Sequence, residues 1–370
     1  MSNKTYYGYS IEQSELASVQ SICVLCWGLL GDVFMRVPVI EALKRRFPAA
    51  NLVVVTDPGS TKVFNNHPDI AEVVSFDRKK KPLFRYLSSL RRQVSYLRRK
   101  RFDLCVDLYA SDSSARISRW IGARIRLGYD HRPALRKCNN LLVRSPKFCG
   151  YWVHALAEML LPLEVKKDQV PAGPNYYVSD AARAAAKDYA GDISSLSVIY
   201  NLGAGAPEKM WPVDRYVSLA CGLNKRYGAV PVVLSSPGHE AITEVFIEGY
   251  KKHSEACVRV PRVDFDVEAA VVEGVDLIIT PDSGLKHLAA GVRTPIAGLY
   301  LATRPEYTAP QNVPFVACMV ERRETADRCG YPLLERDLPV GLVFNKVCGF
   351  VEIVLGWSPL ENTVAHKEII

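Results

Sequence analysis

The sequence predicts an α/β protein with two doubly wound domains, because short apolar strands alternate with amphipathic helices along most of its 370 residues. A chain of this length is long for one domain. The stretch Asp276–Pro305 shows the pattern most clearly, as a buried strand, a turn with a glycine, a helix and a second buried strand. A polar, proline-bearing stretch at Lys166–Asn175 is the expected linker. We therefore expect domains at 1–172 and 173–344, and a last helical segment at 345–370 that packs back on the first domain.

The expected elements alternate in type along both halves. In the first half, apolar runs bounded by turn residues predict strands at Ser21–Cys26, Asn51–Val55, Val73–Ser75 and Leu104–Leu108. Helices are expected from Gly31 to about Phe47, within the basic stretch 78–101, at Ser113–Ile121 and at Trp152–Leu160. In the second half, a helix is expected at Ala181–Tyr189, strands at Ser197–Asn201, Val230–Ser235, Asp276–Thr280 and Thr294–Tyr300, and a last helix at Asn345–Gly356.

The composition is that of a soluble globular protein, with 48% hydrophobic and 23% charged residues. No apolar run reaches membrane-spanning length, and the first residues are too polar for a signal peptide. Cys23 and Cys26 form a C-x-x-C inside an expected buried strand, where burial argues against a redox or metal role. The cysteines show no zinc-site spacing, and free thiols are the plainer account for Cys318, Cys329 and Cys348. We therefore expect a reducing compartment, the cytoplasm.

The net charge of +8 is concentrated in the first half of the chain. Residues 1–170 hold 28 Lys and Arg against 15 Asp and Glu. Most of the excess lies in Arg78–Lys81, Arg91-Arg92 and Arg98–Arg101, and leucines and a valine recur between them at helical spacing. An amphipathic helix with a basic face suggests an anionic partner such as a membrane surface, and a solvated helix face is the alternative. No nucleic-acid-binding motif accompanies the charge, so nucleic acid is not expected.

The first candidate site follows the expected strand at Asp276–Thr280, at whose carboxyl end lie Asp282, Ser283 and Gly284. In open α/β sheets, ligands bind at that edge. Glycine lets a phosphate approach the backbone, and the N–H groups at a helix start point at it. The alternative is that Asp282 or Ser283 only caps the helix, but capping requires neither the glycine nor His287 one turn later. We therefore favour a ligand site.

Two further strand-to-helix turns carry acidic residues. Asp32 follows the first expected strand, where a general base could face a cleft. This turn lacks G-x-G-x-x-G, so a dinucleotide site is not predicted. Glu240 ends the segment Ser235–Glu240 and could accept the two hydroxyls of a ribose. A helix N-cap for Asp32 and an exposed turn residue for Glu240 are the open alternatives.

A third turn is rich in glycine. Gly203, Ala204 and Gly205 follow the expected strand at Ser197–Asn201, as in a turn that cradles a phosphate. Lys209 lies close enough along the chain to add a positive charge. The turn is not a Walker A loop, because it lacks G-K-[ST]. A flexible turn with a surface lysine is the alternative.

Taken together, four blocks resemble glycosyltransferase family 9, the lipopolysaccharide heptosyltransferases. They are GDVFMRVPVIEALKRRFP (31–48), GAGAPEKMWPVDRY (203–216), SSPGHE (235–240) and DSGLKHLAAGVRTPIAGLY (282–300). The resemblance covers about residues 20–320 and implies the GT-B fold, two Rossmann-like domains facing a central cleft. It implies an acceptor site on the N-terminal domain and a nucleotide-sugar site on the C-terminal domain. The implied donor is ADP-heptose, the implied acceptor is the lipopolysaccharide inner core, and no metal or other cofactor is implied.

The resemblance also implies roles for donor-site residues. Lys209 looks like the residue that holds the donor phosphates, and Glu240 is similar to the ribose-binding glutamate. Asp282 looks like the residue that binds donor sugar hydroxyls. Ser283 and Gly284 would present backbone N–H groups to the diphosphate.

Further matches extend these implied sites. Asp32 looks like the base that deprotonates the acceptor hydroxyl. His287 matches the family histidine after the turn, and Val263 sits where the family lays its adenine ring. The basic residues that fall where the family binds acceptor phosphates are Arg78, Lys79, Lys80 and Lys81. An enzyme of this kind would work in the cytoplasm, in peripheral contact with the inner membrane.

The chain departs from the family pattern in three places. Serine stands at 283, where threonine is usual, and Leu301-Ala302-Thr303 replaces the usual Gly-Pro-Thr. Trp27 and its neighbours before Gly31 replace small polar residues. The sequence therefore favours an inverting heptosyltransferase and leaves open another sugar nucleotide or glycan acceptor. Less favoured are a sugar-nucleotide epimerase and a non-catalytic nucleotide-sugar binding protein.

Overall fold

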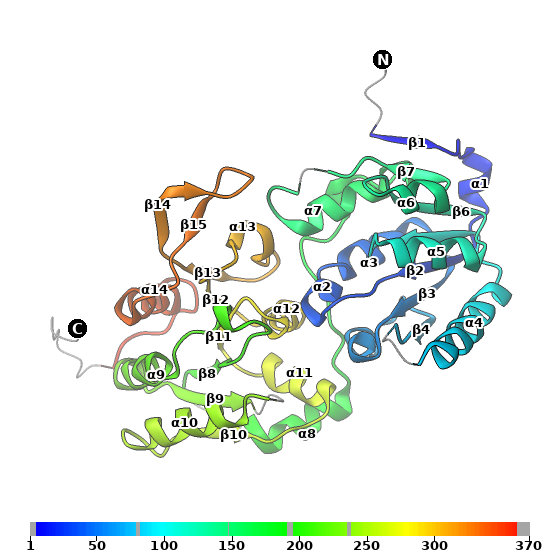
Figure 1. The fold of residues 1–370 in the computed structure, drawn as a ribbon. Helices are drawn as coiled ribbons and strands as arrows, with labels where there is room; N and C mark the ends of the chain where they lie inside the picture. Colours follow the sequence, from blue (N-terminus) through cyan, green and yellow to red (C-terminus); the bar gives the residue numbers. More distant parts are fainter. Residues whose placement is uncertain (1–4, 79–81, 147, 191–194, 235–237, 361–370) are drawn as a thin grey trace. The chain divides into compact units, whose positions relative to one another are not determined.

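The computed structural model describes residues 5–78, 82–146, 148–190, 195–234 and 238–360. The chain divides into two compact units, Met1–Pro174 and Asn175–Ile370 (Figure 1). The division falls inside Lys166–Asn175, the stretch in which the sequence predicts a linker.

The first unit is built on a seven-stranded sheet. Its strands are β1 (Tyr6–Gly8), β2 (Ser21–Leu25), β3 (Asn51–Thr56), β4 (Glu72–Ser75), β5 (Leu104–Asp107), β6 (Ile125–Tyr129) and β7 (Leu141–Val143). They lie in the order β1-β7-β6-β5-β2-β3-β4, and every neighbouring pair is parallel except β1 and β7. With β2 counted as the first strand, the order from β4 to β7 is 3-2-1-4-5-6, which is the doubly wound arrangement. Its topological switch point therefore lies between β2 and β5.

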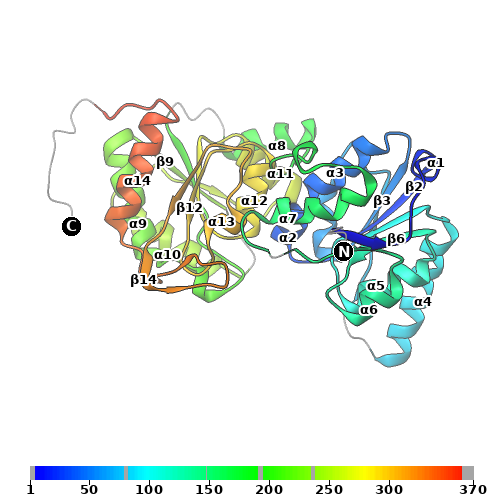
Figure 2. The same ribbon diagram turned by 90° about the horizontal axis from the view of Figure 1, so that it is seen from above.

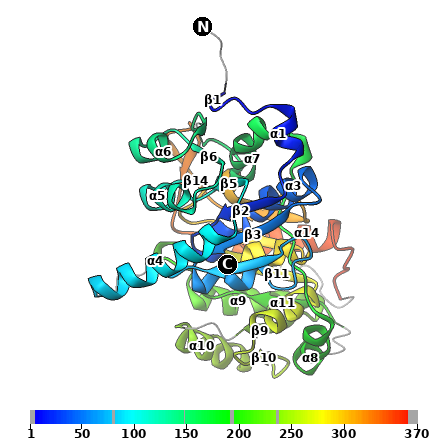
Figure 3. The ribbon, with the colours of Figure 1, turned by 90° about the vertical axis from the view of Figure 1, so that its right-hand side faces the viewer.

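Helices cover both faces of this sheet. They are α1 (Gln13–Ala17), α2 (Leu30–Phe34), α3 (Val37–Arg46), η1 (Pro58–Phe64), α4 (Leu83–Arg99), α5 (Asp112–Ile121), α6 (Pro133–Cys138), α7 (Trp152–Ala157), η2 (Glu158–Leu163) and η3 (Lys167–Gln169). Helices α4 and α5 lie side by side on one face (Figures 2 and 3). There Cys23 and Leu25 of β2 pack in one apolar cluster with Leu97 of α4 and Ile117 of α5. Successive residues of β2 thus alternate between the two faces, both of them buried, as expected for a parallel sheet covered by helices.

The continuous helix expected from Gly31 to about Phe47 is wrong. The segment forms two helices, α2 and α3, and the chain turns between them at Met35 and Arg36. Pro38 occupies the second position of α3. Proline has no N–H to donate and is tolerated only in the first turn of a helix, so it starts a new helix here.

The second unit repeats the arrangement with a six-stranded parallel sheet. Its strands are β8 (Ser197–Tyr200), β9 (Val230–Leu234), β10 (Val258–Val260), β11 (Leu277–Pro281), β12 (Ile296–Leu299) and β13 (Phe315–Cys318). Their order is β10-β9-β8-β11-β12-β13, which is 3-2-1-4-5-6 when β8 is counted first. The switch point of this sheet lies between β8 and β11.

The helices of the second unit are α8 (Asp180–Ala190), η4 (Pro207–Lys209), α9 (Val213–Tyr227), α10 (Glu240–Lys251), α11 (Phe265–Glu273), α12 (Gly284–Gly291), α13 (Pro305–Thr308) and α14 (Val340–Ile353). A two-stranded antiparallel hairpin, β14 (Glu321–Ala326) and β15 (Pro332–Leu334), precedes the last helix. Helix α14 lies beside α9, and its residues Val343, Val347 and Val351 belong to the core of this unit (Figure 1). The expectation that 345–370 packs on the first domain is therefore corrected for the described residues up to 360, because the apolar face of α14 is buried within the second unit.

The cysteines mostly behave as expected. Eight are free thiols, and burial raises the pKa of Cys26 to about 11, which argues against a redox role for the C-x-x-C. Cys329 is disulfide-bonded, so the expectation of a free buried thiol at that position is wrong. Cys329 lies in the turn between β14 and β15, where it is only half-buried. Among the residues that the structure describes, no helix has the length and apolar character of a membrane span.

Candidate functional site

The carboxylate of Asp282 is the centre of the polar cluster at the switch point of the second sheet. It lies at the carboxyl end of β11 and is 8% exposed. Its Oδ2 accepts hydrogen bonds from Lys209 Nζ at 2.9 Å and from Thr303 Oγ1 at 2.7 Å. Its Oδ1 accepts from Lys286 Nζ and, at 3.0 Å, from Thr308 Oγ1. Two ammonium groups therefore meet one carboxylate, which leaves the cluster with an excess positive charge.

The two lysines differ in their surroundings. Lys286, on α12, is fully buried, and its ammonium also donates to Tyr300 Oη at 3.1 Å and to Thr308 Oγ1 at 2.9 Å. Lys209 ends the short helix η4 in the loop after β8, and its side chain is partly exposed. Lys286 is therefore locked into the protein, whereas Lys209 is open to solvent and to a ligand.

Burial and charge set the protonation of this cluster. Burial would raise the pKa of Asp282, but the charges of Lys286 and Lys209 outweigh it and hold that pKa far below its ordinary range. Burial lowers the pKa of Lys286, and the Asp282 carboxylate opposes that shift. Burial, and after it the charge of Lys286, lowers the pKa of His287 to about 3. At neutral pH, Asp282 is an anion and His287 is uncharged.

Ser283 stands at the N-cap position of α12 but makes no side-chain capping bond. Its hydroxyl instead accepts from Asn201 Nδ2 at 2.8 Å, and the same amide donates to Thr280 Oγ1 at 2.8 Å. Asn201 thus ties the end of β8 to the end of β11. The first N–H groups of a helix have no acceptor within the helix. The backbone N–H of Gly284, at the start of α12, can therefore bind an anion. The side chains at 282 and 283 therefore do more than cap a helix.

Close packing explains why one position of the loop after β8 is a glycine. A Cβ on Gly203 would lie 2.6 Å from His239 Nδ1, because the ring of His239 rests on this backbone. Gly205 has open space around it, so only Gly203 is fixed by this contact. Glu240 is the exposed first residue of α10, directly after His239. Residues 235–237 of the same block lie outside the described residues.

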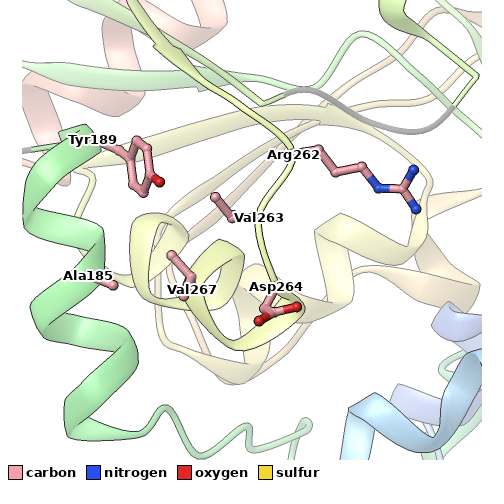
Figure 4. A pocket seen from close by; sticks show the side chains of 6 residues that line it. All are labelled: Ala185, Tyr189, Arg262, Val263, Asp264 and Val267. Atoms are coloured by element: carbon pink, nitrogen blue, oxygen red, sulfur yellow. The ribbon is translucent and has the colours of Figure 1, made fainter.

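Val263 lines a hollow of about 520 Å³ between α8 and the start of α11 (Figure 4). Its other lining residues are Ala185, Tyr189, Arg262, Asp264 and Val267. The hollow combines an aromatic ring and two valines with one acidic and one basic side chain. Such a lining suits a flat heterocyclic base.

In the first unit, Asp32 is an exposed residue of α2, just beyond the carboxyl end of β2. The N-cap of α2 is Leu29, so the alternative that Asp32 caps this helix is wrong. Gly28 has a φ of +145°, and a Cβ there would lie 2.9 Å from Arg36 Nη1 and 3.1 Å from Asp32 Cβ. Glycine at 28 therefore allows the turn that places Asp32 at the sheet edge.

Arg78 is held in place by its neighbours. Its guanidinium lies 5.0 Å from the ring centre of Trp27 and 4.4 Å from that of Tyr109. It also pairs with Asp57 at 3.0 Å, and Asp57 accepts the Gly28 N–H at 3.0 Å. The charge of Arg78 is therefore already compensated. Lys79, Lys80 and Lys81 lie outside the described residues.

The structure thus gathers several of the candidate residues at two places, and Glu240 and Val263 belong to neither. Lys209 and Asp282 meet at the switch point of the second sheet, with Ser283, Gly284 and His287 on the same strand-to-helix turn. Asp32 and Arg78 both lie around Gly28 at the switch point of the first sheet.

Several residues of the site were not predicted. Lys286 had a usable signal, because it lies four residues after Asp282 and so on the same face of a helical turn. Thr303 had a signal in the family resemblance, because it matches the threonine of the usual Gly-Pro-Thr. Thr308 had none, since it reaches Asp282 from the short helix after β12. Asn201 could be recognised only once β8 and β11 were known to be neighbours.

Two Rossmann-like units, each with candidate residues at the switch point of its sheet, are the architecture of the GT-B fold. The family described as glycosyltransferase family 9 (heptosyltransferase) matches residues 89–331, well over half of the chain. The chain belongs to this family.

The chain is similar to curated and solved members of the family. It is 26% identical to lipopolysaccharide heptosyltransferase 3 of Escherichia coli over 292 residues, which cover 74% of this chain and 81% of that protein. A glycosyltransferase of family 9 from Veillonella parvula DSM 2008 superposes with a TM-score of 0.77 at 19% identity, covering 90% of this chain and 97% of that one. The E. coli heptosyltransferase WaaC with ADP-2-deoxy-2-fluoro heptose gives a TM-score of 0.67 at 19% identity, covering 90% and 99%.

Proposed function

We propose that this enzyme is an inverting glycosyltransferase that transfers heptose from ADP-heptose to a lipopolysaccharide inner-core acceptor. Membership of family 9 and the similarity to lipopolysaccharide heptosyltransferase 3 support the sugar and the acceptor. The shared fold with E. coli WaaC, a heptosyltransferase solved with ADP-2-deoxy-2-fluoro heptose, supports the donor. The observation that carries the proposal is the Asp282 carboxylate with two lysines at the switch point of the second sheet.

The excess positive charge of that cluster suits a diphosphate. Lys209 is partly exposed, and its ammonium can donate hydrogen bonds to the sugar-nucleotide substrate. The start of α12 offers backbone N–H groups nearby. In the proposal these groups bind the diphosphate of ADP-heptose and stabilise the charge that develops on ADP as it leaves. Asp282 receives hydroxyls of the donor sugar, Glu240 the ribose, and the hollow at Val263 the adenine. These groups supply the stabilising positive charge, so no metal cofactor is proposed.

Asp32 is proposed as the general base. Its exposed carboxylate takes the proton of the acceptor hydroxyl as the oxygen attacks the anomeric carbon. The bond from that carbon to the diphosphate oxygen breaks, and the electron pair leaves with ADP. A single displacement of this kind inverts the configuration at the anomeric carbon.

The acceptor is proposed to be reached from the cytoplasmic face of the inner membrane. Helix α4 exposes two large apolar side chains, Phe84 at 69% and Leu87 at 52%, in a helix with exposed Arg85, Arg91 and Arg92. Exposed apolar groups among arginines suit contact with an anionic lipid surface. A sugar-nucleotide epimerase would have a soluble substrate and no use for such a surface.

The proposal is tested by incubating the enzyme with ADP-heptose and a heptose-deficient lipopolysaccharide core and measuring ADP release and the mass of the glycan. We expect one heptose to be added and ADP to be released in equal amount. If product forms only with a different sugar nucleotide, ADP-heptose is not the donor, but the enzyme is still a glycosyltransferase. ADP release that is independent of the acceptor would contradict the proposed transfer.

A further inference from the structure

The buried ion pair of Lys286 and Asp282 has a consequence for Lys209. All three ammonium protons of Lys286 have protein acceptors: the Asp282 carboxylate, Tyr300 Oη and Thr308 Oγ1. Its ammonium also lies 5.1 Å from the ring centre of Tyr300. The side chain is fully buried, so it offers no donor to a ligand. Lys286 therefore cannot act on a substrate directly.

Asp282 is shared between this lysine and Lys209. Lys286 binds Oδ1 and Lys209 binds Oδ2, so each lysine has its own carboxylate oxygen. Thr303 also donates to Oδ2 and Thr308 to Oδ1, so each oxygen has a second hydrogen-bond donor. If Lys209 leaves for a ligand, the carboxylate keeps a buried cation and two hydroxyl donors. It does not become an unpaired buried charge, which would be strongly unfavourable.

We propose that Lys286 is a positioning residue, a permanent counter-ion of Asp282 that leaves the charge of Lys209 available to the diphosphate of a nucleotide-sugar donor. Without Lys286, Lys209 becomes the sole cation of a buried carboxylate and is held there by a stronger attraction. This inference deepens the proposed function and rests on it, because it concerns how the same site binds a nucleoside diphosphate.

The test uses the full chain and measures the affinities of ADP and adenosine by calorimetry at neutral pH. Lys286→Met keeps the length of the buried side chain and removes its charge. We expect its affinity for ADP to be roughly tenfold weaker and its affinity for adenosine to be unchanged, because adenosine has no phosphate for Lys209 to bind. The ADP affinity of the variant should also depend less on salt concentration.

A double variant separates the electrostatic role from a structural one. In Asp282→Asn/Lys286→Met both buried charges are removed, so Lys209 is released, and ADP affinity should return to within about threefold of the wild type. Lys225→Met is the matched control, since it removes the charge of an exposed lysine in the last turn of α9 and should change ADP affinity less than about twofold.

The outcomes distinguish this inference from the proposed donor. Unchanged ADP affinity in Lys286→Met would overturn the inference, as would equal losses for ADP and adenosine, or a double variant as weak as the single one. Failure of the wild type to bind ADP would overturn the proposed donor instead. The same comparison is then made with the nucleoside diphosphate and nucleoside that do bind.

Discussion

The contact between Lys209 and Asp282 joins two residues that lie 73 positions apart in the sequence. Each was predicted separately, from a lysine near a glycine-rich turn and from a carboxylate before a helix. Their meeting depends on β8 and β11 being neighbours, which short sequence patterns do not specify. Lys286 was overlooked, because a lysine in an apolar helix usually points to solvent, whereas this one is buried by its pairing with Asp282.

The general-base role of Asp32 gives the first prediction. Asp32→Asn keeps the size of the side chain but cannot accept the acceptor proton, so kcat should fall by roughly 10²–10⁴-fold. The melting temperature and ADP affinity should stay near those of the wild type, because Asp32 does not cap α2. Asp180→Asn, at a fully exposed aspartate in the first turn of α8, is the control and should turn over normally. Wild-type turnover in Asp32→Asn would remove Asp32 from the chemistry.

The second prediction concerns Lys209. Lys209→Ala should weaken ADP binding by about 1.5–3 kcal/mol, the contribution of a charge-assisted hydrogen bond. The fold should survive, since Asp282 keeps its pair with Lys286. Lys225→Ala, at an exposed lysine in the last turn of α9, should bind ADP as the wild type does. Equal calorimetric affinities for the two variants would show that Lys209 does not touch the diphosphate.

The buried His287 predicts a pH dependence of stability. Its pKa is about 3 in the folded protein and near 6.5 when unfolded, so the unfolded state binds the proton more readily. Its contribution to stability is therefore fully present above pH 6.5 and is lost as the pH falls toward 3. At pH 5 the loss is about 2 kcal/mol. His287→Asn should show a shallower fall of the unfolding free energy between pH 7 and 5, and His253→Asn, at an exposed histidine, should follow the wild type. Identical slopes for His287→Asn and the wild type would refute the shifted pKa.

At the scale of elements, apolar runs predicted the long buried strands well. The expected strand at Ser21–Cys26 is β2, Ser21–Leu25, and Asn51–Val55 is β3, Asn51–Thr56. The hairpin of β14 and β15 was not predicted, because the charged sequence of β14 forms a strand only through pairing with β15. Arg304 then holds this hairpin by donating to Glu321 at 2.8 Å and to the Pro332 carbonyl at 2.7 Å, a long-range contact with no local signal.

Helix α4 gives the prediction at this scale. The double variant Phe84→Ser/Leu87→Ser should sediment less with anionic vesicles, because it removes exposed apolar area from a basic helix. Its stability should change little, since the core of the unit is contacted by Leu90, Val94 and Leu97 of the same helix. Val245→Ser on α10 is the matched control, with an equally exposed valine outside the basic helix, and should sediment like the wild type. Negligible sedimentation of the wild-type protein at low salt would leave α4 as a solvated face.

At the scale of the whole molecule, the alternation of strands and helices predicted two doubly wound units and placed the linker close to the observed division. The strand orders could not be predicted from the sequence. They matter for function because ligands of doubly wound sheets bind at the switch point, and the strand order sets its position. Both sheets have the order 3-2-1-4-5-6. In the second unit, Lys209 and Asp282 follow the two strands that flank the switch point, β8 and β11. The prediction that the last helix packs on the first domain was wrong. Its apolar face packs in the core of the second unit, and the periodicity of a helix does not identify the core on which it packs.

The separate cores of the two units lead to the last prediction. Each unit has its own sheet and its own apolar cluster, so a ligand that binds one unit should protect that unit against local opening. ADP at 100 times its dissociation constant stabilises the state that binds it by about 2.7 kcal/mol. In amide hydrogen exchange we expect ADP to slow exchange in peptides that cover 201–210 and 277–291, and to leave peptides that cover 21–36 unchanged. Adenosine should protect peptides around Val263 but protect 277–291 much less, since it has no diphosphate for Lys209 and α12 to bind. ADP protection confined to 21–36 would place the nucleotide on the first unit and overturn the assignment of donor and acceptor sites.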